Sequence, residues 1–211
     1  MCRVIAIANQ KGGVGKTTTT SNLGIGLARQ GKKVLLIDAD AQGSLTASLG
    51  IREPDRLEIT LATIMGNIIN DEEIRSDYGI LSHDEGVDFI PGNIELSGLE
   101  TSLINVMSRE TVLRTYIDLQ RENYDYILID CPPSLSLLTI NAFMASDSVI
   151  IPIQCEYYAL EGLNQMLRTV NLIRERLNPT LEIEGIVFTM YDARNNLSGQ
   201  VIEGVKSVIS D

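Results

Sequence analysis

Between residues 10 and 18 the chain reads Gln10-Lys11-Gly12-Gly13-Val14-Gly15-Lys16-Thr17-Thr18. A run of β-branched and alanine residues, Arg3–Asn9, precedes this stretch, and apolar residues at helical spacing follow it from Thr17 to Gln30. Glycines allow a tight loop whose successive N–H groups turn inward, and the first turn of a helix adds unpaired N–H groups. The strand, the glycine-rich loop and the helix together predict a cradle for phosphate groups.

Two lysines and a threonine determine the chemistry of this loop. Lys16 is expected to contact the β- and γ-phosphates of a nucleotide, and the Thr17 hydroxyl is expected to bind Mg²⁺ between them. Nucleotide contacts are predicted for Lys11, Gly12, Gly13, Val14, Gly15, Lys16, Thr17 and Thr18.

The loop departs from the usual pattern G-x-x-x-x-G-K-[ST] at one position. The first glycine of that pattern would stand at residue 10, where this chain has Gln10 followed by a second lysine. Lys11 either adds positive charge beside the phosphates or reaches outward to the phosphates of another molecule. A solvated loop lysine is the plain alternative.

Three aspartates follow two further apolar runs. Asp38 and Asp40 come at the end of Lys33–Asp38, and Asp130 ends Tyr126–Asp130. The carboxyl ends of parallel strands gather at one edge of a sheet, beside the phosphate loop. Asp130 is therefore the candidate Walker B carboxylate that holds Mg²⁺, usually through water. Asp40 is the candidate that orients the attacking water, whereas Asp38 either braces the phosphate loop or caps its strand.

Apolar strands alternate with helices along the rest of the chain. Further strands are expected at Val87–Ile90, Ser148–Ile153 and Glu184–Met190, and further helices at 60–69, 95–122, Ser134–Ala145, Glu156–Leu177 and Leu197–Ile209. This alternation predicts an α/β fold, the three-layer α/β/α arrangement of P-loop NTPases with a mostly parallel central sheet. Its 211 residues, without an internal repeat or a linker, are expected to form a single domain.

Charge, histidine and cysteine content exclude several classes of site. The chain has 17 Lys+Arg against 28 Asp+Glu, a net charge of −11 that opposes nucleic-acid binding except through a local basic patch. His83 is the only histidine, so a His-based triad or a His-rich metal site has no material. The three cysteines (Cys2, Cys131, Cys155) have no metal-ligand spacing, which fits a reducing cytoplasm. No apolar run approaches the roughly 20 residues needed to cross a bilayer.

Four segments carry a resemblance to a known family: Q-K-G-G-V-G-K-T-T-T at 10–19, L-I-D-A-D-A-Q-G at 36–43, D-Y-I-L-I-D-C-P-P-S at 125–134 and P-I-Q-C-E-Y-Y-A-L-E-G at 152–162. They resemble the ParA/Soj partitioning ATPases, which belong with MinD to the deviant Walker A class. The resemblance covers nearly the whole chain, and its last two segments point to the ParA/Soj branch. It implies an ATP-binding and ATP-hydrolysing switch that acts in chromosome or plasmid partitioning.

The resemblance also assigns roles to the candidate catalytic residues. Lys11 resembles the lysine that crosses an ATP-sandwich dimer to the phosphates of the partner. Lys16 resembles the P-loop lysine, and Asp40 matches the acidic residue of the first switch loop that hydrolysis needs. Cys131–Ser134 would form the second switch.

The remaining site residues are assigned in the same way. Thr17 and Asp130 would bind the metal, with Asp130 as the Walker B carboxylate. Met190 and Asp192, in the sequence Thr189-Met190-Tyr191-Asp192, lie where the family contacts the adenine.

The family implies further properties of the whole protein. ATP and Mg²⁺ would be the cofactors, and the ATP state would be a homodimer that binds DNA non-specifically. A ParB/Spo0J-type partner would stimulate slow hydrolysis in the cytoplasm, at the nucleoid in the ATP state and not at a membrane. Ala41 and Ser44 replace the commoner Pro and Asn of the family's first switch. Family members usually continue past the point of Asp211 with a strand and a helix that serve the adenine pocket and the DNA-binding surface, which this domain is expected to lack.

Three other functions compete with partitioning. The main alternative is a MinD-like ATP-dependent membrane-associated positioning ATPase, which would need a basic amphipathic tail, whereas G-V-K-S-V-I-S-D contains one lysine. A carrier like the nitrogenase iron protein would need two cysteines per subunit at a dimer axis, but Cys131 and Cys155 are interpreted as small buried apolar residues. A small-molecule kinase or synthetase would need an acceptor pocket, and the sequence leaves it open.

Overall fold

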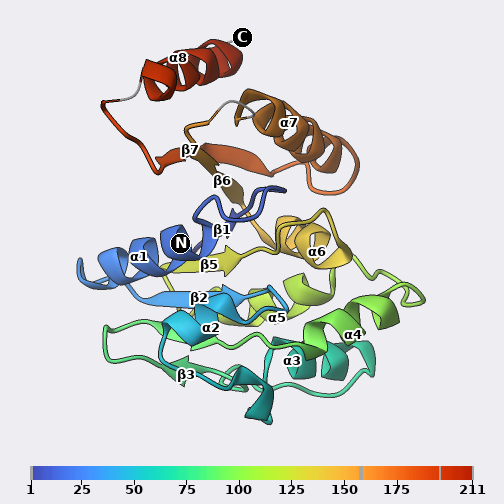
Figure 1. Cartoon of the computed structure of the whole chain (residues 1–211). Coiled ribbons are helices and arrows are strands. Elements are labelled where there is room, and N and C mark those ends of the chain that lie inside the picture. Colours follow the sequence, from blue (N-terminus) through green and yellow to red (C-terminus); the bar gives the residue numbers. More distant parts are fainter. Residues whose placement is uncertain (1, 157–158, 195, 211) are drawn as a thin grey trace.

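The chain folds around one sheet. The computed structural model describes residues 2–156, 159–194 and 196–210, and within them seven strands are ordered β3-β4-β2-β5-β1-β6-β7 (Figure 1). Neighbouring strands are parallel except β3 and β4, which are antiparallel. The strands are β1 (Arg3–Ile7), β2 (Val34–Asp38), β3 (Leu81–Ser82), β4 (Asp88–Ile90), β5 (Tyr126–Asp130), β6 (Ser148–Gln154) and β7 (Glu182–Thr189). The predicted mostly parallel sheet is confirmed.

Helices pack on both faces of this sheet. They are α1 (Lys16–Ala28), α2 (Ser44–Ser48), α3 (Leu61–Ile69), α4 (Glu95–Leu103), α5 (Val112–Gln120), α6 (Leu137–Ala145), α7 (Ala159–Arg176) and α8 (Asn196–Ser210), with a 3-10 helix, η1 (Pro54–Arg56). The expected start of the seventh helix includes residues 157–158, which lie outside the described residues.

The side chains of β1 show why helices must pack on both faces of the sheet. Val4 and Ala6 join the core formed with α3 to α8, whereas Ile5 and Ile7 join the core formed with α1 and α2. Successive side chains of a strand point to opposite faces, so a strand that is apolar throughout must be buried on both sides. The three-layer α/β/α arrangement follows from this pattern and is confirmed.

The structure corrects one prediction, the single helix over 95–122. The chain forms α4 and α5 instead, joined by a turn in which Ser108 adopts a left-handed conformation with φ 53°. The Arg109 guanidinium donates to the carbonyl of Ile104 at 2.7 Å and satisfies the end of α4. Asn141 of α6 accepts from the Leu113 N–H at 3.1 Å and donates to the Arg109 carbonyl at 2.8 Å. The contacts of Asn141, which lies in a distant helix, fix the break between α4 and α5. The apolar spacing within residues 95–122 contains no information about them.

Candidate nucleotide-binding site

The glycine-rich loop leaves β1 and enters α1 as the sequence predicts. Gly13 has φ 73° and Gly15 has φ 86°, a left-handed conformation that glycine adopts without strain. A Cβ on Gly15 would also lie 3.3 Å from Cγ2 of Thr189. Thr189 Oγ1 donates to the Val14 carbonyl at 2.9 Å, so a hydrogen bond joins the end of β7 to the loop. Val14 is buried there, and it shapes the loop through its backbone.

The first turn of α1 suits an anion. Gly15 is the N-cap, no side chain caps the helix, and the first turn contains no acidic residue. Unpaired N–H groups at a helix N-terminus, together with the helix dipole, favour phosphate oxygens. These features make α1 a suitable seat for the phosphates of a nucleotide.

Lys16 is buried at the centre of the loop, with 7% of its surface exposed. Its Nζ donates to the carbonyl of Lys11 at 3.2 Å. Burial lowers the pKa of Lys16, and the negative charges of Asp130 and Asp40 oppose that effect. Among the described residues, the Lys11 carbonyl is the only hydrogen-bond acceptor of this ammonium group, and the carboxylates of Asp130 and Asp40 lie near it. The oxygens of an anionic ligand would occupy its remaining donors.

Thr17 and Asp130, the two predicted metal ligands, lie side by side. Thr17 Oγ1 donates to Asp130 Oδ2 at 2.6 Å, and Thr20 Oγ1 donates to Asp130 Oδ1 at 3.4 Å. Burial raises the pKa of Asp130 to about 7, and the Thr17 hydrogen bond opposes the rise. A buried carboxylate beside a hydroxyl fits Mg²⁺, which needs few protein ligands and keeps waters and phosphates. No cluster of three His, Cys, Asp or Glu side chains exists in the described part of the chain, so a metal here would depend on the nucleotide.

Asp38 holds the segment of residues 39–46, which contains Asp40, rather than the phosphate loop. Its Oδ2 accepts from the N–H and the hydroxyl of Thr46 at 2.8 and 2.6 Å, and its Oδ1 accepts from the Asp40 N–H at 3.3 Å. Burial raises the pKa of Asp38 to about 6, and the Thr46 hydrogen bonds oppose the rise. No hydrogen bond from the described phosphate loop reaches Asp38, so its bracing partner is the segment that positions Asp40.

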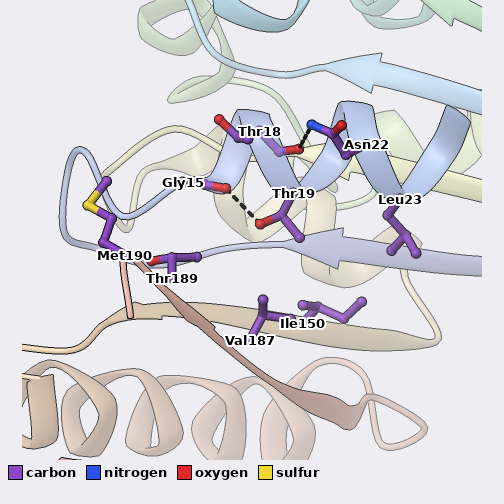
Figure 2. Close-up of a pocket in the computed structure, with 9 residues that line it drawn as sticks. All are labelled: Gly15, Thr18, Thr19, Asn22, Leu23, Ile150, Val187, Thr189 and Met190. Carbon is purple, nitrogen blue, oxygen red and sulfur yellow. Dashed lines mark hydrogen bonds between the residues drawn. The ribbon is translucent and has the colours of Figure 1, made fainter. Parts of the chain in front are cut away.

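Two adjoining cavities border the loop. The first, about 380 Å³, is lined by Gly12, Gly13, Gly15, Lys16, Thr17, Thr18, Asp40, Ser44, Pro133 and Met190. The second, about 640 Å³, is mostly apolar and lies between α1 and strands β6 and β7 (Figure 2). Gly15, Thr18 and Met190 line both cavities. The first suits phosphates, and the second offers apolar surface to the rest of a nucleotide.

Figure 2 shows how the second cavity is built. Thr19 and Leu23 project from α1, and Ile150 and Val187 project toward them from β6 and β7. Met190 closes the end nearest the loop, in a left-handed conformation with φ 52°. The apolar walls and the polar turn at Gly15 give the combined cavity one end for charge and one for an apolar group.

Three predicted contact residues, Lys11, Val14 and Asp192, line neither cavity. Asp192 binds Arg194, whose guanidinium donates to both carboxylate oxygens at 3.0 and 2.9 Å, and this pairing lowers the pKa of Asp192. Lys11 forms an ion pair with Glu156. The adenine contact of Asp192 and the trans contact of Lys11 stay predictions.

The sequence alone does not single out several residues that shape the site. They are Asn9, which bonds to both β6 and the loop, Thr46 and Thr189, which hold the loops around the cavity, and Glu156. Their partners lie 2 to 175 positions away along the chain. Asn9 is adjacent to the motif, and Thr189 and Glu156 lie within stretches that the family resemblance includes, so the sequence marks these three positions but not their contacts.

Comparison with known proteins identifies the family. A family model described as an AAA domain matches residues 2–183. The Soj sporulation initiation inhibitor of Bacillus subtilis is 52% identical over 211 residues, which are the whole of this chain and 81% of that protein. The chain belongs to the ParA/Soj family of P-loop NTPases. The ParA chromosome partitioning protein of Caulobacter vibrioides is 49% identical, over 99% of this chain and 77% of its own length.

Solved structures of family relatives share the fold. A structure titled cobyrinic acid a,c-diamide synthase from Mycobacterium smegmatis, with ADP and magnesium bound, has a TM-score of 0.91 at 40% identity and covers 98% of this chain and 82% of its own. A plasmid partition protein of Borrelia burgdorferi, bound to AMPPNP, has a TM-score of 0.80 at 30% identity and covers 97% and 82%. A nucleotide in these relatives agrees with the cavity found beside the loop.

Proposed function

We propose that the protein is an ATP-dependent dimerisation switch that acts in chromosome or plasmid partitioning and hydrolyses ATP slowly. The observation that carries this proposal is the site itself. Lys16, Thr17 and Asp130 converge beside the uncapped end of α1, in a chain 52% identical to Soj across its whole length. A relative with a bound ATP analogue and magnesium supports both cofactors.

The proposed roles follow from the positions of the side chains. Lys16 would bind the β- and γ-phosphates, and Thr17 with Asp130 would hold Mg²⁺, which neutralises charge that develops on the phosphates. Asp40 lines the phosphate cavity and would orient the attacking water. Lys11, at the outer rim, would contact the phosphates of a second subunit.

The decisive experiment measures the molar mass of the full chain in solution by size-exclusion chromatography with light scattering. ATP with Mg²⁺ is expected to give a dimer and ADP a monomer, because only the γ-phosphate contacts differ between the two states. Lys11→Ala should remove the dimer, whereas Lys32→Ala, the same charge change at an exposed loop position, should not. Monomers in every nucleotide would refute the switch.

Hydrolysis gives a second test of the same proposal. Asp40→Ala should bind ATP and remain dimeric, because turnover is blocked while nucleotide binding is kept. Asp84→Ala, an exposed aspartate far from the cavity, serves as the control. Phosphate release at the wild-type rate in Asp40→Ala would remove that residue from the catalytic set.

DNA binding and partner stimulation are proposed on family grounds. Curated relatives at 47–49% identity are named as chromosome partitioning proteins. Adding DNA in a second arm of the light-scattering experiment should retain the ATP dimer and not the ADP monomer. Stimulation of phosphate release by a ParB-type protein in the presence of DNA tests the partner.

Two alternatives are less well supported. Among the described helices none is long and apolar enough to cross a membrane, and α8 has one basic residue, Lys206, so the MinD-like alternative gains no support. The synthase title of one structural relative favours a small-molecule synthetase as second candidate. That reading predicts monomeric turnover that depends on an added acceptor and survives Lys11→Ala.

A further inference from the structure

The lysine that is proposed to act on a second subunit is paired within its own subunit. Lys11 Nζ forms an ion pair with Oε1 of Glu156, and the two side chains are 44% and 33% exposed. That oxygen is itself shielded from solvent and has no other polar partner in the described part of the chain. Because 33% of the Glu156 side chain is exposed, water would hydrate its carboxylate without Lys11, and the pair is a partly exposed ion pair of modest strength.

Hydrogen bonds of the Asn9 side chain bring the segments that carry Lys11 and Glu156 together. Asn9, 5% exposed, donates from Nδ2 to the Pro152 carbonyl at 2.7 Å and accepts at Oδ1 from the Lys11 N–H at 3.0 Å. These two hydrogen bonds tie the start of the loop to β6. Glu156 lies two residues beyond the end of β6. The Glu156 carbonyl accepts from the N–H of Ala159, the first residue of α7, at 3.0 Å.

The same lysine is linked to the phosphate site. Lys16 Nζ donates to the Lys11 carbonyl at 3.2 Å. The ammonium group has three N–H donors, so Lys16 can contact a phosphate while it keeps this bond. A nucleotide held by Lys16 would therefore lie next to the backbone of Lys11.

We propose that Glu156 is a positioning residue that holds Lys11 in its own subunit until a nucleotide and a second subunit are present. This inference rests on the proposed dimerisation switch. Glu156 competes with the phosphates of the partner for the Lys11 ammonium, so it sets the protein concentration at which ATP produces a dimer. Each dimer requires the release of two such pairs, so the effect on the dimer association constant is the square of the effect of one pair.

The test compares Glu156→Gln, Glu156→Asp and a control, Glu175→Gln, in the full chain. Glu175 is exposed near the far end of α7 and undergoes the same charge change. The first measurement uses nucleotide-free protein and follows acetylation of Lys11 by limiting acetic anhydride, normalised to exposed Lys32, with peptide mass spectrometry. The second follows the monomer–dimer midpoint in ATP with Mg²⁺ by light scattering.

In Glu156→Gln, Lys11 should be acetylated faster than in the wild type, because the Lys11 ammonium group is no longer paired with a carboxylate. A partly exposed ion pair corresponds to about a twofold to fivefold effect, so two pairs should raise the dimer association constant by about 4- to 25-fold. Glu156→Asp should retain much of the wild-type protection, and Glu175→Gln should change neither quantity. Affinity of the monomer for ATP should stay near the wild-type value.

Other outcomes separate the two proposals. Unchanged Lys11 acetylation in Glu156→Gln refutes the pairing, and a weaker dimer would show that Glu156 supports the dimer instead of restraining it. A wild-type protein that binds ATP and remains monomeric refutes the dimerisation switch, while its acetylation pattern still reports on the pair.

Discussion

Replacement of Asp130 by Asn should stabilise the nucleotide-free protein while it impairs metal-dependent nucleotide binding. Asp130 is 1% exposed, and burial raises its pKa from 3.8 to about 7. The native state therefore binds a proton that the unfolded state has released between these two values. Asn keeps the shape and can still accept the 2.6 Å hydrogen bond from Thr17, but it carries no charge to desolvate.

The size of the effect follows from the pKa difference. Each pH unit between the unfolded and native pKa corresponds to 1.36 kcal/mol. Because the native pKa is the higher one, wild-type stability falls as pH rises from about 4 to about 7 and is constant above that. Asp130→Asn should thus raise the free energy of unfolding by about 2 kcal/mol at pH 5 and by about 4 kcal/mol at pH 8.

Urea denaturation at the two pH values measures this difference. Asp84→Asn, at an exposed position, is the control for the loss of one negative charge. With ATP and Mg²⁺ present, the wild type should gain stability from the ligand and Asp130→Asn should gain much less. The reasoning is wrong if Asp130→Asn destabilises the nucleotide-free protein, or if its gain is the same at both pH values.

Two predictions concern the support of the segment of residues 39–46. Thr46→Val removes the hydroxyl that donates to Asp38 at 2.6 Å and accepts from the Gly92 N–H at 2.9 Å. The loss of the Gly92 contact is the same at every pH, whereas the loss of the Asp38 contact, about 1.5–3 kcal/mol by urea denaturation, should appear at pH 8 and shrink at pH 5, because the pKa of Asp38 is about 6. An equal loss at both values would contradict the role of the charge. Gly92→Ala places a Cβ 2.4 Å from the Asp38 carbonyl oxygen, in rigid backbone, and should destabilise the protein by about 1–3 kcal/mol. Gly98→Ala in α4, where a Cβ meets nothing within 4 Å, should be neutral or slightly stabilising.

The sequence predicts the parts of the fold that local patterns determine. Continuous apolar runs identify β1, β2 and β5, because strands buried on both faces cannot alternate with polar residues. The glycine-rich motif predicts the loop and the start of α1, because its glycines allow the tight turn that joins a strand to a helix around a phosphate. Asp130 lies beside Thr17 because parallel strands end at one edge of the sheet.

Features that depend on distant partners are invisible to such patterns. The break between α4 and α5 is fixed by Asn141, 28 residues beyond Leu113. The sequence leaves two possible roles for Asp38, and its hydrogen bonds to Thr46 form only once β2 and α2 are packed. Lys11 and Glu156 belong to separate loops, and Asn9 brings them together by binding β6.

The electrostatics of the site link its stability to its ligand. The pKa values of Asp38 and Asp130 are raised and that of Lys16 is lowered, so burial disfavours the charged form of all three groups. A nucleotide alone would add negative charge beside Asp130 and increase this cost, whereas Mg²⁺ supplies the compensating positive charge. Metal and nucleotide should therefore bind as a unit, because each would compensate the charge that the other brings into the site.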